Sequence, residues 1–496
     1  MVGALDEPTR IAIALIAVGL LAAIAAVLTR ISRRGSVPVA FLFLAIGVIA
    51  GAVAFGHNDV GDYRMAFRLG TVALIAILFD GGLNTRADAI RRYLAPAITL
   101  ATVGVLLTAG ALAALSVLVG LPWREAVLLG AVVSSTDAAA VFSVLRGSGA
   151  HLRQRVGMTI ELESGFNDPM AVILTVAMTV ITVGGPVDPL HLAWAVPVQL
   201  AVGAVAGAAI GVGCRTLLRR LPPAASGLLP IMTISAAVTS YGVATLAWGS
   251  GFLAVYVCGL VLGARPLPDH AGLRRVHDFL AWFAQIAMFL TLGLLVLPSQ
   301  LLGVAGVALA LALLLAVVVR PLAVALCLLP FRYPPREIVY IGWVGLRGAV
   351  PIVLATFPVV AGVDGASRVF TIVFFVVAVS VLVQGATVPW LTRRLDLEAT
   401  VPPVPSAAIE IASMRTVEER IACFYIDPRS AVAGAMIADI PLPADAAVML
   451  VVRDVRLLAG RGETQLEPGD HVYVFCRPED EPMVSLWFGR RADEEA

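Results

Sequence analysis

Charged residues are scarce in this chain of 496 residues. They make up 14% of it, whereas soluble domains carry about a quarter, and hydrophobic residues make up 59%. The mean hydropathy is +0.92. This composition excludes an ordinary soluble globular protein, so we expect the lipid bilayer to surround most of the chain.

Lysine is absent, and all 35 basic residues are arginine, a bias that says little about function. The formal net charge of +1 does not indicate a nucleic-acid partner. Five cysteines are scattered without a CxxC pair, so neither a disulfide framework nor a metal site is indicated. The sequence also lacks a GxxxxGK[ST] phosphate loop, which argues against a process driven by ATP.

Long apolar runs dominate the first four-fifths of the chain. About 20 helical residues cross the hydrocarbon of a bilayer. The first run follows Asp6 and Glu7 instead of a basic segment, and we expect it to be a retained helix and not a cleaved signal. The thirteen candidate helices lie near residues 11–29, 37–56, 67–84, 95–119, 125–145, 153–183, 194–218, 228–248, 251–264, 277–297, 301–329, 337–359 and 367–392.

Arginines in the connecting segments predict the orientation of these helices. Alternate loops on one side hold 19 arginines, and those on the other side hold five. Cytoplasmic loops are enriched in basic residues. An odd number of spans then places the N-terminus outside and the C-terminus in the cytoplasm of a plasma (inner) membrane.

The composition changes after Arg394, where prolines appear and charged residues return. Two segments there, Ala447–Arg453 and His471–Phe475, have the residue pattern of strands. We therefore expect a small α+β cytoplasmic domain, which is small enough to favour dimerisation. The predicted parts are a transmembrane domain (1–395), a linker (396–413), a regulatory domain (414–482) and a tail (483–496).

Six ionisable residues lie inside the apolar runs, where each costs several kcal/mol unless it serves a function or has a partner. One interpretation is that acids and arginines pair to hold helices together, which suits Glu163, Arg320 and Arg347. Four acids against two arginines leave a surplus, so at least one carboxylate should be protonated or face an exchangeable cation. The six residues are Asp80, Asp137, Glu163, Asp168, Arg320 and Arg347.

The sixth run contains Glu161–Pro169, which concentrates oxygen-bearing side chains within about two helical turns. Pro169 has no N–H, so the carbonyl of Gly165 is left free beside Asn167 and Asp168. A cation stripped of water needs several such oxygens. The segment predicts a cation site at Asp168, and the alternative is that Asp168 only caps a kink.

Two other runs contain signals that interrupt a helix. Ser134–Ala138 is a helix start placed in mid-span, and Gly342–Pro351 combines three glycines with a proline. Two interrupted helices indicate a midplane site between inverted repeats. Because helix ends carry partial charges, Asp137 and Arg347 are expected to offset them without touching a substrate.

These segments resemble the monovalent cation:proton antiporter 1 family, NhaP type, over about residues 10–395. The later segments Ile440–Pro443 and Leu466–Asp470 resemble the C-terminal half of potassium-regulating RCK modules, the TrkA-C domain. Together they resemble the potassium/proton branch. The membrane motifs are Leu78–Leu83, Thr136–Ser143, Glu163–Pro169 and Gly345–Pro351.

The resemblance implies an all-α polytopic fold of about 13 helices with inverted repeats, which dimerises and moves a six-helix core against a scaffold. It implies that cation and proton compete for Asp168, and that an Asn167–Asp168 pair gives electroneutral exchange. Ser164, Thr136 and Asp80 would coordinate the ion or line its path. Glu163 and Arg347 would form a structural pair, and Arg320 would be a core-stabilising charge.

The resemblance therefore implies a secondary antiporter of K⁺ or Na⁺ and protons, not an enzyme, with no cofactor. Sodium/proton exchange by the same fold is the main alternative to potassium/proton exchange. An RCK-gated cation channel is another, although the sequence lacks a TVGYG-like filter. A membrane sensor that transports nothing, whose intramembrane charges only pair, is the third.

Overall fold

The computed structural model divides the chain into two units, residues 1–150 with 155–397, and residues 151–154 with 398–496. The predicted first helix, 11–29, and most of the predicted linker lie outside the continuously described part. The described residues are 38–55, 62–85, 87–184, 189–220, 228–264, 267, 270–399, 420–428, 430–443, 446–453, 456–477 and 479–489, with isolated residues among the first 27.

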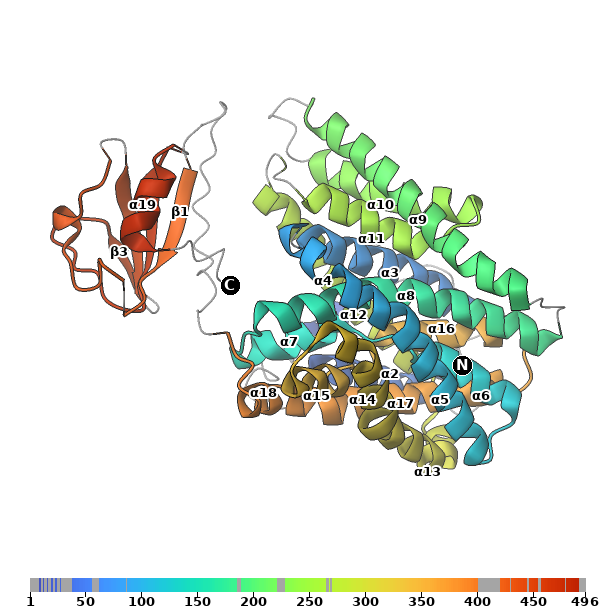
Figure 1. Ribbon diagram of the computed structural model, residues 1–496. Coiled ribbons are helices and arrows are strands. Elements are labelled where there is room, and N and C mark those ends of the chain that lie inside the picture. The colour runs from blue at the N-terminus through green and yellow to red at the C-terminus, as the bar shows by residue number, and fades with distance from the viewer. Residues whose placement is uncertain are drawn as a thin grey trace. The chain divides into compact units, whose positions relative to one another are not determined.

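The larger unit is helical (Figure 1). Three of its long helices contain a five-residue π turn, named η2 (Leu100–Gly104), η4 (Leu315–Val319) and η6 (Ser380–Gln384). Its α-helices are α2 (Val39–Phe55), α3 (Tyr63–Asn84), α4 (Ala87–Thr99), α5 (Val105–Leu118), α6 (Trp123–Val133), α7 (Ala138–Ser148), α8 (Gln154–Val183), α9 (Pro189–Leu218), α10 (Leu228–Leu246), α11 (Gly251–Gly263), α12 (His270–Leu294), α13 (Pro298–Leu314), α14 (Arg320–Leu328), α15 (Pro335–Trp343), α16 (Ala349–Val360), α17 (Ala366–Val379) and α18 (Gly385–Arg394).

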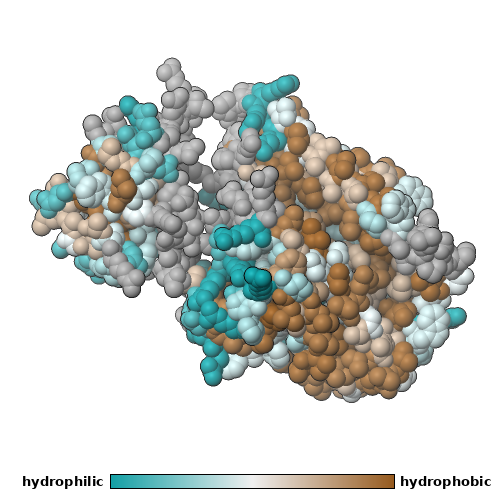
Figure 2. Space-filling model, in the orientation of Figure 1, coloured by the Kyte–Doolittle hydropathy of each residue, from teal (hydrophilic) through white to brown (hydrophobic). Residues whose placement is uncertain are grey.

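Length and composition suit these helices to a membrane. Among the described residues, eight helices are long and apolar enough to cross one, or nine if the bent pair α6–α7 counts as one span. Large apolar side chains such as Leu118 and Trp194 are 81% and 71% exposed, which is favourable in lipid. Figure 2 shows how much of this unit's visible face is hydrophobic. The total of thirteen helices stays a prediction.

Two sets of three spans follow the same order along the chain. The first set is α4–η2–α5, then α6–α7, then α8, and the second is α13–η4–α14, then α15–α16, then α17–η6–α18. In both sets a long helix with a π turn precedes an interrupted helix, which precedes another long helix. This repetition agrees with the expected internal repeats.

The two interrupted helices meet at their breaks, as the sequence predicts. α6 and α7 are bent by 49°. The Asp137 N–H, in the first break, donates to the Leu346 carbonyl, in the second, at 2.8 Å. The beginning of α6 lies near the turn after α16, where a Cβ at Gly365 would touch Glu125. The beginning of α15 lies near the start of α8, where Glu337 meets Arg155. The helices therefore cross antiparallel, and the repeats are inverted.

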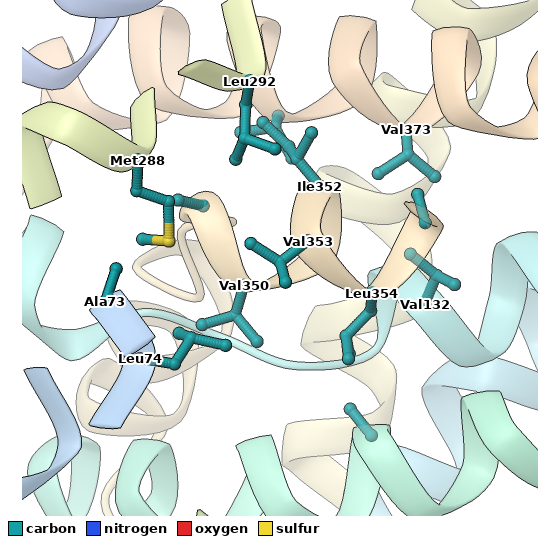
Figure 3. Close-up of a cluster of buried hydrophobic side chains, with 14 of the residues drawn as sticks. Ala73, Leu74, Val132, Met288, Leu292, Val350, Ile352, Val353, Leu354 and Val373 are labelled. Atoms are coloured by element: carbon teal, nitrogen blue, oxygen red, sulfur yellow. The ribbon is translucent and has the colours of Figure 1, made fainter. Parts of the chain in front are cut away.

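Helix α16, which is the second half of the interrupted helix α15–α16, is buried between other helices (Figure 3). It packs on α3, α12, α6 and α17. Its apolar side chains pack against theirs in one buried hydrophobic cluster, and this packing fixes the position of α16. The residues labelled in Figure 3 are Val350, Ile352, Val353 and Leu354 of α16, Ala73 and Leu74 of α3, Met288 and Leu292 of α12, Val132 of α6 and Val373 of α17.

Glycines let α3 and α11 approach closely. A Cβ at Gly259 or Gly263 would collide with the α3 backbone, and one at Gly82 would collide with the α11 backbone. Small residues at helix contacts bring backbones together in lipid, where packing replaces the hydrophobic effect as the driving force. This contact holds α3, and with it Asp80, against α11.

The smaller unit contains a four-stranded antiparallel sheet in the order β1–β4–β2–β3. Strands β2 (Ala447–Arg453) and β4 (His471–Cys476) confirm the two predicted strands. The edge strands β1 (Arg420–Tyr425) and β3 (Arg456–Ala459) were not predicted. Helix α19 (Glu481–Phe488) packs on the sheet, with the rings of Phe488 and Phe424 5.4 Å apart. The domain is α+β, as expected.

Arg453, at the end of β2, binds the side chains of the turn that precedes β4. Both guanidinium contacts of Arg453 with the buried carboxylate of Asp470 are 2.9 Å long, and Arg453 also pairs with Glu467. Asp470 in turn accepts a hydrogen bond from the Glu467 N–H at 2.8 Å. The Leu466–Asp470 motif therefore has a structural reason in this fold.

Candidate functional site

The first helix break brings Thr136 together with two polar residues of α8. The Asn167 amide donates to the Thr136 hydroxyl at 2.6 Å, and the Ser164 hydroxyl donates to the Thr136 carbonyl at 3.0 Å. The Ala138 N–H, at the start of α7, donates to the Ser164 hydroxyl at 3.2 Å. Three predicted site residues therefore meet where the break gives access to the backbone.

Asp168 lies next to this cluster and is 6% exposed. Its neighbour is the side chain of Ser135, in the same break. Within the described residues, Asp168 Oδ1, Ser135 Oγ and Asn167 Oδ1 are buried oxygen atoms without a hydrogen-bond partner. Buried polar atoms are nearly always satisfied. A carboxylate, a hydroxyl and an amide oxygen are suitable ligands for a partly dehydrated cation, so the residues fit a cation as substrate.

Two charged residues lie at the ends of the half-helices. Asp137 caps α7 by accepting from the Ala140 N–H at 3.1 Å, and its carboxylate also lies against Gly348, the N-cap of α16. Arg347 donates to the Ser135 carbonyl at 2.7 Å, at the end of α6. The negative group is therefore at helix N-termini and the positive group at a C-terminus, where each offsets the partial charge.

The structure corrects one predicted contact. Glu163 pairs with Arg320 of α14 and not with Arg347. Glu163 Oε1 lies 2.5 Å from Arg320 Nη2. Both side chains are 2% exposed. Arg347 instead donates from Nη1 to the carbonyl groups of Ser134 and Ser135 at the first break. The sequence did not distinguish the two arginines, because both follow Glu163 by more than 150 positions.

Asp80 is not joined to this cluster by a hydrogen bond among the described residues. Its carboxylate accepts from the Asn84 amide at 2.8 Å, one turn later on α3. The charges that act on it come from Asp278, Arg274 and Arg146. Asp80 therefore belongs to a separate group of charged residues beside α12, and a role on the ion path remains a prediction.

Sequence reasoning missed the residues that support the second break. The Arg347 N–H donates to the Ser380 hydroxyl at 3.1 Å, which donates to the Gln384 side chain at 2.6 Å. The Gln384 amide donates to the Trp343 carbonyl, the last residue of α15, at 2.7 Å. Two polar residues four apart in the apolar run 367–392 were the available signal.

Comparison with known families assigns both units. Residues 19–394 match the model described as "Sodium/hydrogen exchanger, transmembrane", and residues 422–489 match the TrkA-C domain. A potassium/proton antiporter NhaP from Alkalimonas amylolytica is 41% identical over 479 residues, which cover 95% of this chain and 82% of the relative. The potassium/proton antiporter NhaP2 of Shewanella sp. (strain MR-4) is 40% identical, with the same coverage.

A solved structure, the sodium proton antiporter MjNhaP1 from Methanocaldococcus jannaschii at pH 8, has a similar fold. Its TM-score is 0.67 at 22% sequence identity, over 78% of this chain and 99% of that one. The family model covers well over half of this chain, and the two relatives align along almost its whole length. The chain therefore belongs to the sodium/hydrogen exchanger family of membrane proteins and carries a C-terminal TrkA-C domain.

Proposed function

We propose that this protein exchanges a monovalent cation, preferably K⁺, for protons across the membrane. The observation that carries the proposal is the buried carboxylate of Asp168, beside unsatisfied oxygens of Ser135 and Asn167 at a helix break. Broken helices at mid-span are where secondary transporters bind ions, because freed backbone groups and helix ends are available there.

Competition at one carboxylate gives the mechanism. When Asp168 is ionised it can hold a partly dehydrated cation, and when it is protonated it is neutral. Both loaded states avoid moving a bare charge through hydrocarbon, whereas the empty ionised state does not. Moving between the two sides is therefore favourable only with a cation or a proton bound, which couples the two fluxes without ATP or a cofactor.

The other intramembrane charges near the break support one-for-one exchange. Of the other two acids, Glu163 is paired with Arg320 and Asp137 caps α7. Asn167, the residue before Asp168, carries no charge. Asp168 is then the one carboxylate of this group that is available to alternate between cation and proton. One cation would leave for each proton that binds, so the exchange is electroneutral.

The choice of K⁺ over Na⁺ follows the relatives. The proteins at about 40% identity, which match the TrkA-C region as well, are named potassium/proton antiporters. Sodium is the second candidate, because a sodium/proton antiporter NhaS2 from Synechocystis is 26% identical over 343 residues, 66% of this chain. The structural neighbour is also a sodium antiporter.

The cellular setting is part of the proposal. The arginine bias of the loops supports a plasma (inner) membrane protein with its N-terminus outside and its C-terminus in the cytoplasm. The family resemblance and the small size of the C-terminal domain support a homodimer. The TrkA-C domain would be regulatory, since a ligand can shift a transporter only by binding its states with different affinity.

Cation-driven pH change in proteoliposomes tests this function. We expect K⁺ added to the full-length protein to move protons at a lower concentration than Na⁺ does. A protein truncated after Leu397 should keep this preference and change only its dependence on pH or ligand, because the described residues of the site at Asp168 all belong to the larger unit. Absence of proton movement with either ion would refute antiport, and a changed preference after truncation would refute the division of roles.

A further inference from the structure

Two half-helices far apart in the chain begin in the same way. α6 follows Pro122, with φ −56° and ψ 141°, and α15 follows Pro334, with φ −59° and ψ 145°. In each helix the second residue is arginine and the third is glutamate, Glu125 in α6 and Glu337 in α15. A glutamate in the first turn is favourable at the positive end of a helix.

Each glutamate pairs with an arginine of the other repeat. Glu125 Oε2 lies 3.7 Å from Arg368 Nη1, on the first turn of α17. Glu337 Oε2 lies 3.3 Å from Arg155 Nε, on the first turn of α8. Glu125, in the second span of the first repeat, contacts the third span of the second repeat. Glu337, in the second span of the second repeat, contacts the third span of the first repeat. The two contacts are thus counterparts under the inversion.

Burial distinguishes these pairs from ordinary surface ion pairs. The glutamate side chains are 11% and 8% exposed, whereas their arginine partners are 48% and 37% exposed, and within the described part of the chain neither glutamate Oε2 atom has a hydrogen bond. Each arginine therefore offsets a largely desolvated charge, and removing it would leave that charge uncompensated.

The surroundings hold both pairs in place. The Arg155 guanidinium lies 3.9 Å from the Tyr333 ring centroid and donates to the Arg332 carbonyl at 3.3 Å. Gly365, with φ +79°, lies so close to Glu125 that a Cβ there would collide with the carboxylate. The local structure around each pair therefore restricts where the charged groups can lie.

The positions of the pairs connect them to the ion site. α6 and α15 each have one end at a pair and the other end at a break. Ser135 lies in the first break, two residues after the end of α6. Its carbonyl accepts a hydrogen bond from Arg347, and its side chain lies beside Asp168. Arg155 is on α8, the helix that also carries Asp168. Because a helix is stiff, an ion pair that fixes the first turn of α6 or α15 also fixes how far the last turn of that helix extends toward the break.

We propose that Glu125–Arg368 and Glu337–Arg155 are matched positioning pairs, one at each end of the crossing, that set how far the two half-helices reach toward Asp168. This inference rests on the proposed antiport. Cation affinity then depends on four residues that do not touch the cation.

Neutral variants of the full-length protein test the pairs. Glu125→Gln and Glu337→Gln keep the shape of the side chain and remove its charge. We expect each to raise the apparent KM for K⁺ about two- to fivefold, the range given by one partly exposed ion pair. The maximal rate per folded protein should change by less than about twofold. Glu125→Asp, which keeps the charge, should shift KM less.

The residue before each glutamate provides a matched control. Arg336 pairs at 3.6 Å with Asp396, which is 80% exposed, and Arg124 stacks near Trp123. Arg124→Gln and Arg336→Gln should keep the wild-type KM. Stabilisation of each variant against heat by added K⁺ measures binding without transport, since a ligand of the folded state raises the melting temperature.

The outcomes separate the two proposals. If the wild-type protein exchanges K⁺ and both glutamine variants keep its KM, losing only melting temperature or rate, the pairs are merely structural and the inference is wrong. A shift in one variant and not in the other would show that the pairs are not counterparts. If the wild type itself moves no protons, the antiport proposal fails first.

Discussion

Replacing Asp168 by asparagine should abolish cation-driven proton movement while the protein still folds and purifies. Asparagine keeps the size of the side chain and its ability to accept a hydrogen bond, but it cannot release a proton or carry the charge that holds a cation. Because Asp168 is the carboxylate left over when Glu163 and Asp137 are accounted for, no other group at the break replaces it. Proteoliposomes loaded with a pH dye measure the loss.

Asp80→Asn is the matched control for this variant. Asp80 is also an intramembrane acid, but its hydrogen bond is to Asn84 and it belongs to the charged group beside α12. We expect a higher apparent KM with a measurable maximal rate, in contrast to the complete loss at Asp168. Wild-type exchange by the Asp168→Asn protein would disprove the assignment of the site, and complete loss in both variants would place Asp80 in the site as well.

Removing either partner of the Glu163–Arg320 pair should be the most destabilising single change among the intramembrane charges. The two side chains are 2% exposed. A buried charge that loses its partner costs roughly 3 to 5 kcal/mol, whereas replacing both partners by apolar residues of similar volume is often neutral. Glu163→Gln and Arg320→Met should therefore unfold at lower temperature, and the double variant Glu163→Leu with Arg320→Met should recover much of the loss.

The unfolding of purified protein in detergent, followed by heating and by size-exclusion chromatography, measures this effect. Arg347→Gln is the informative comparison, because Arg347 lies close by but donates to the carbonyls of Ser134 and Ser135. If the two single variants of the pair were as stable as wild type, or if Glu163→Gln were rescued by changing Arg347 and not Arg320, the pairing seen here would be incorrect.

Local sequence signals were enough to predict the features that depend on neighbouring residues. The helix-start pattern before Ala138 and the glycines and proline around Arg347 predicted both breaks, because capping and helix breaking act within a few residues. The concentration of polar residues in Glu161–Pro169 predicted the cluster that the structure places beside Thr136. Strands β2 and β4 followed from short apolar runs, rich in valine, that a polar, glycine-containing segment separates.

Features that depend on distant contacts were not predictable from the sequence. Glu163 and Arg320 are 157 positions apart, and nothing local distinguishes Arg320 from Arg347 as a partner. The pairs at Glu125 and Glu337 are recognisable only once the antiparallel crossing is known. The edge strands β1 and β3 have six and four residues and carry little pattern of their own, since pairing with β4 and β2 defines them.

The apparent KM for K⁺ of the full-length protein, measured in proteoliposomes as the pH on the cation side is lowered stepwise, tests competition at Asp168 most directly. If one proton and one cation exclude each other at a single carboxylate, KM should rise about tenfold for each pH unit once protonation begins, while the maximal rate at saturating K⁺ stays constant. A maximal rate that falls with pH at an unchanged KM would contradict this account, because it would mean that protons act at a site separate from the one that binds the cation.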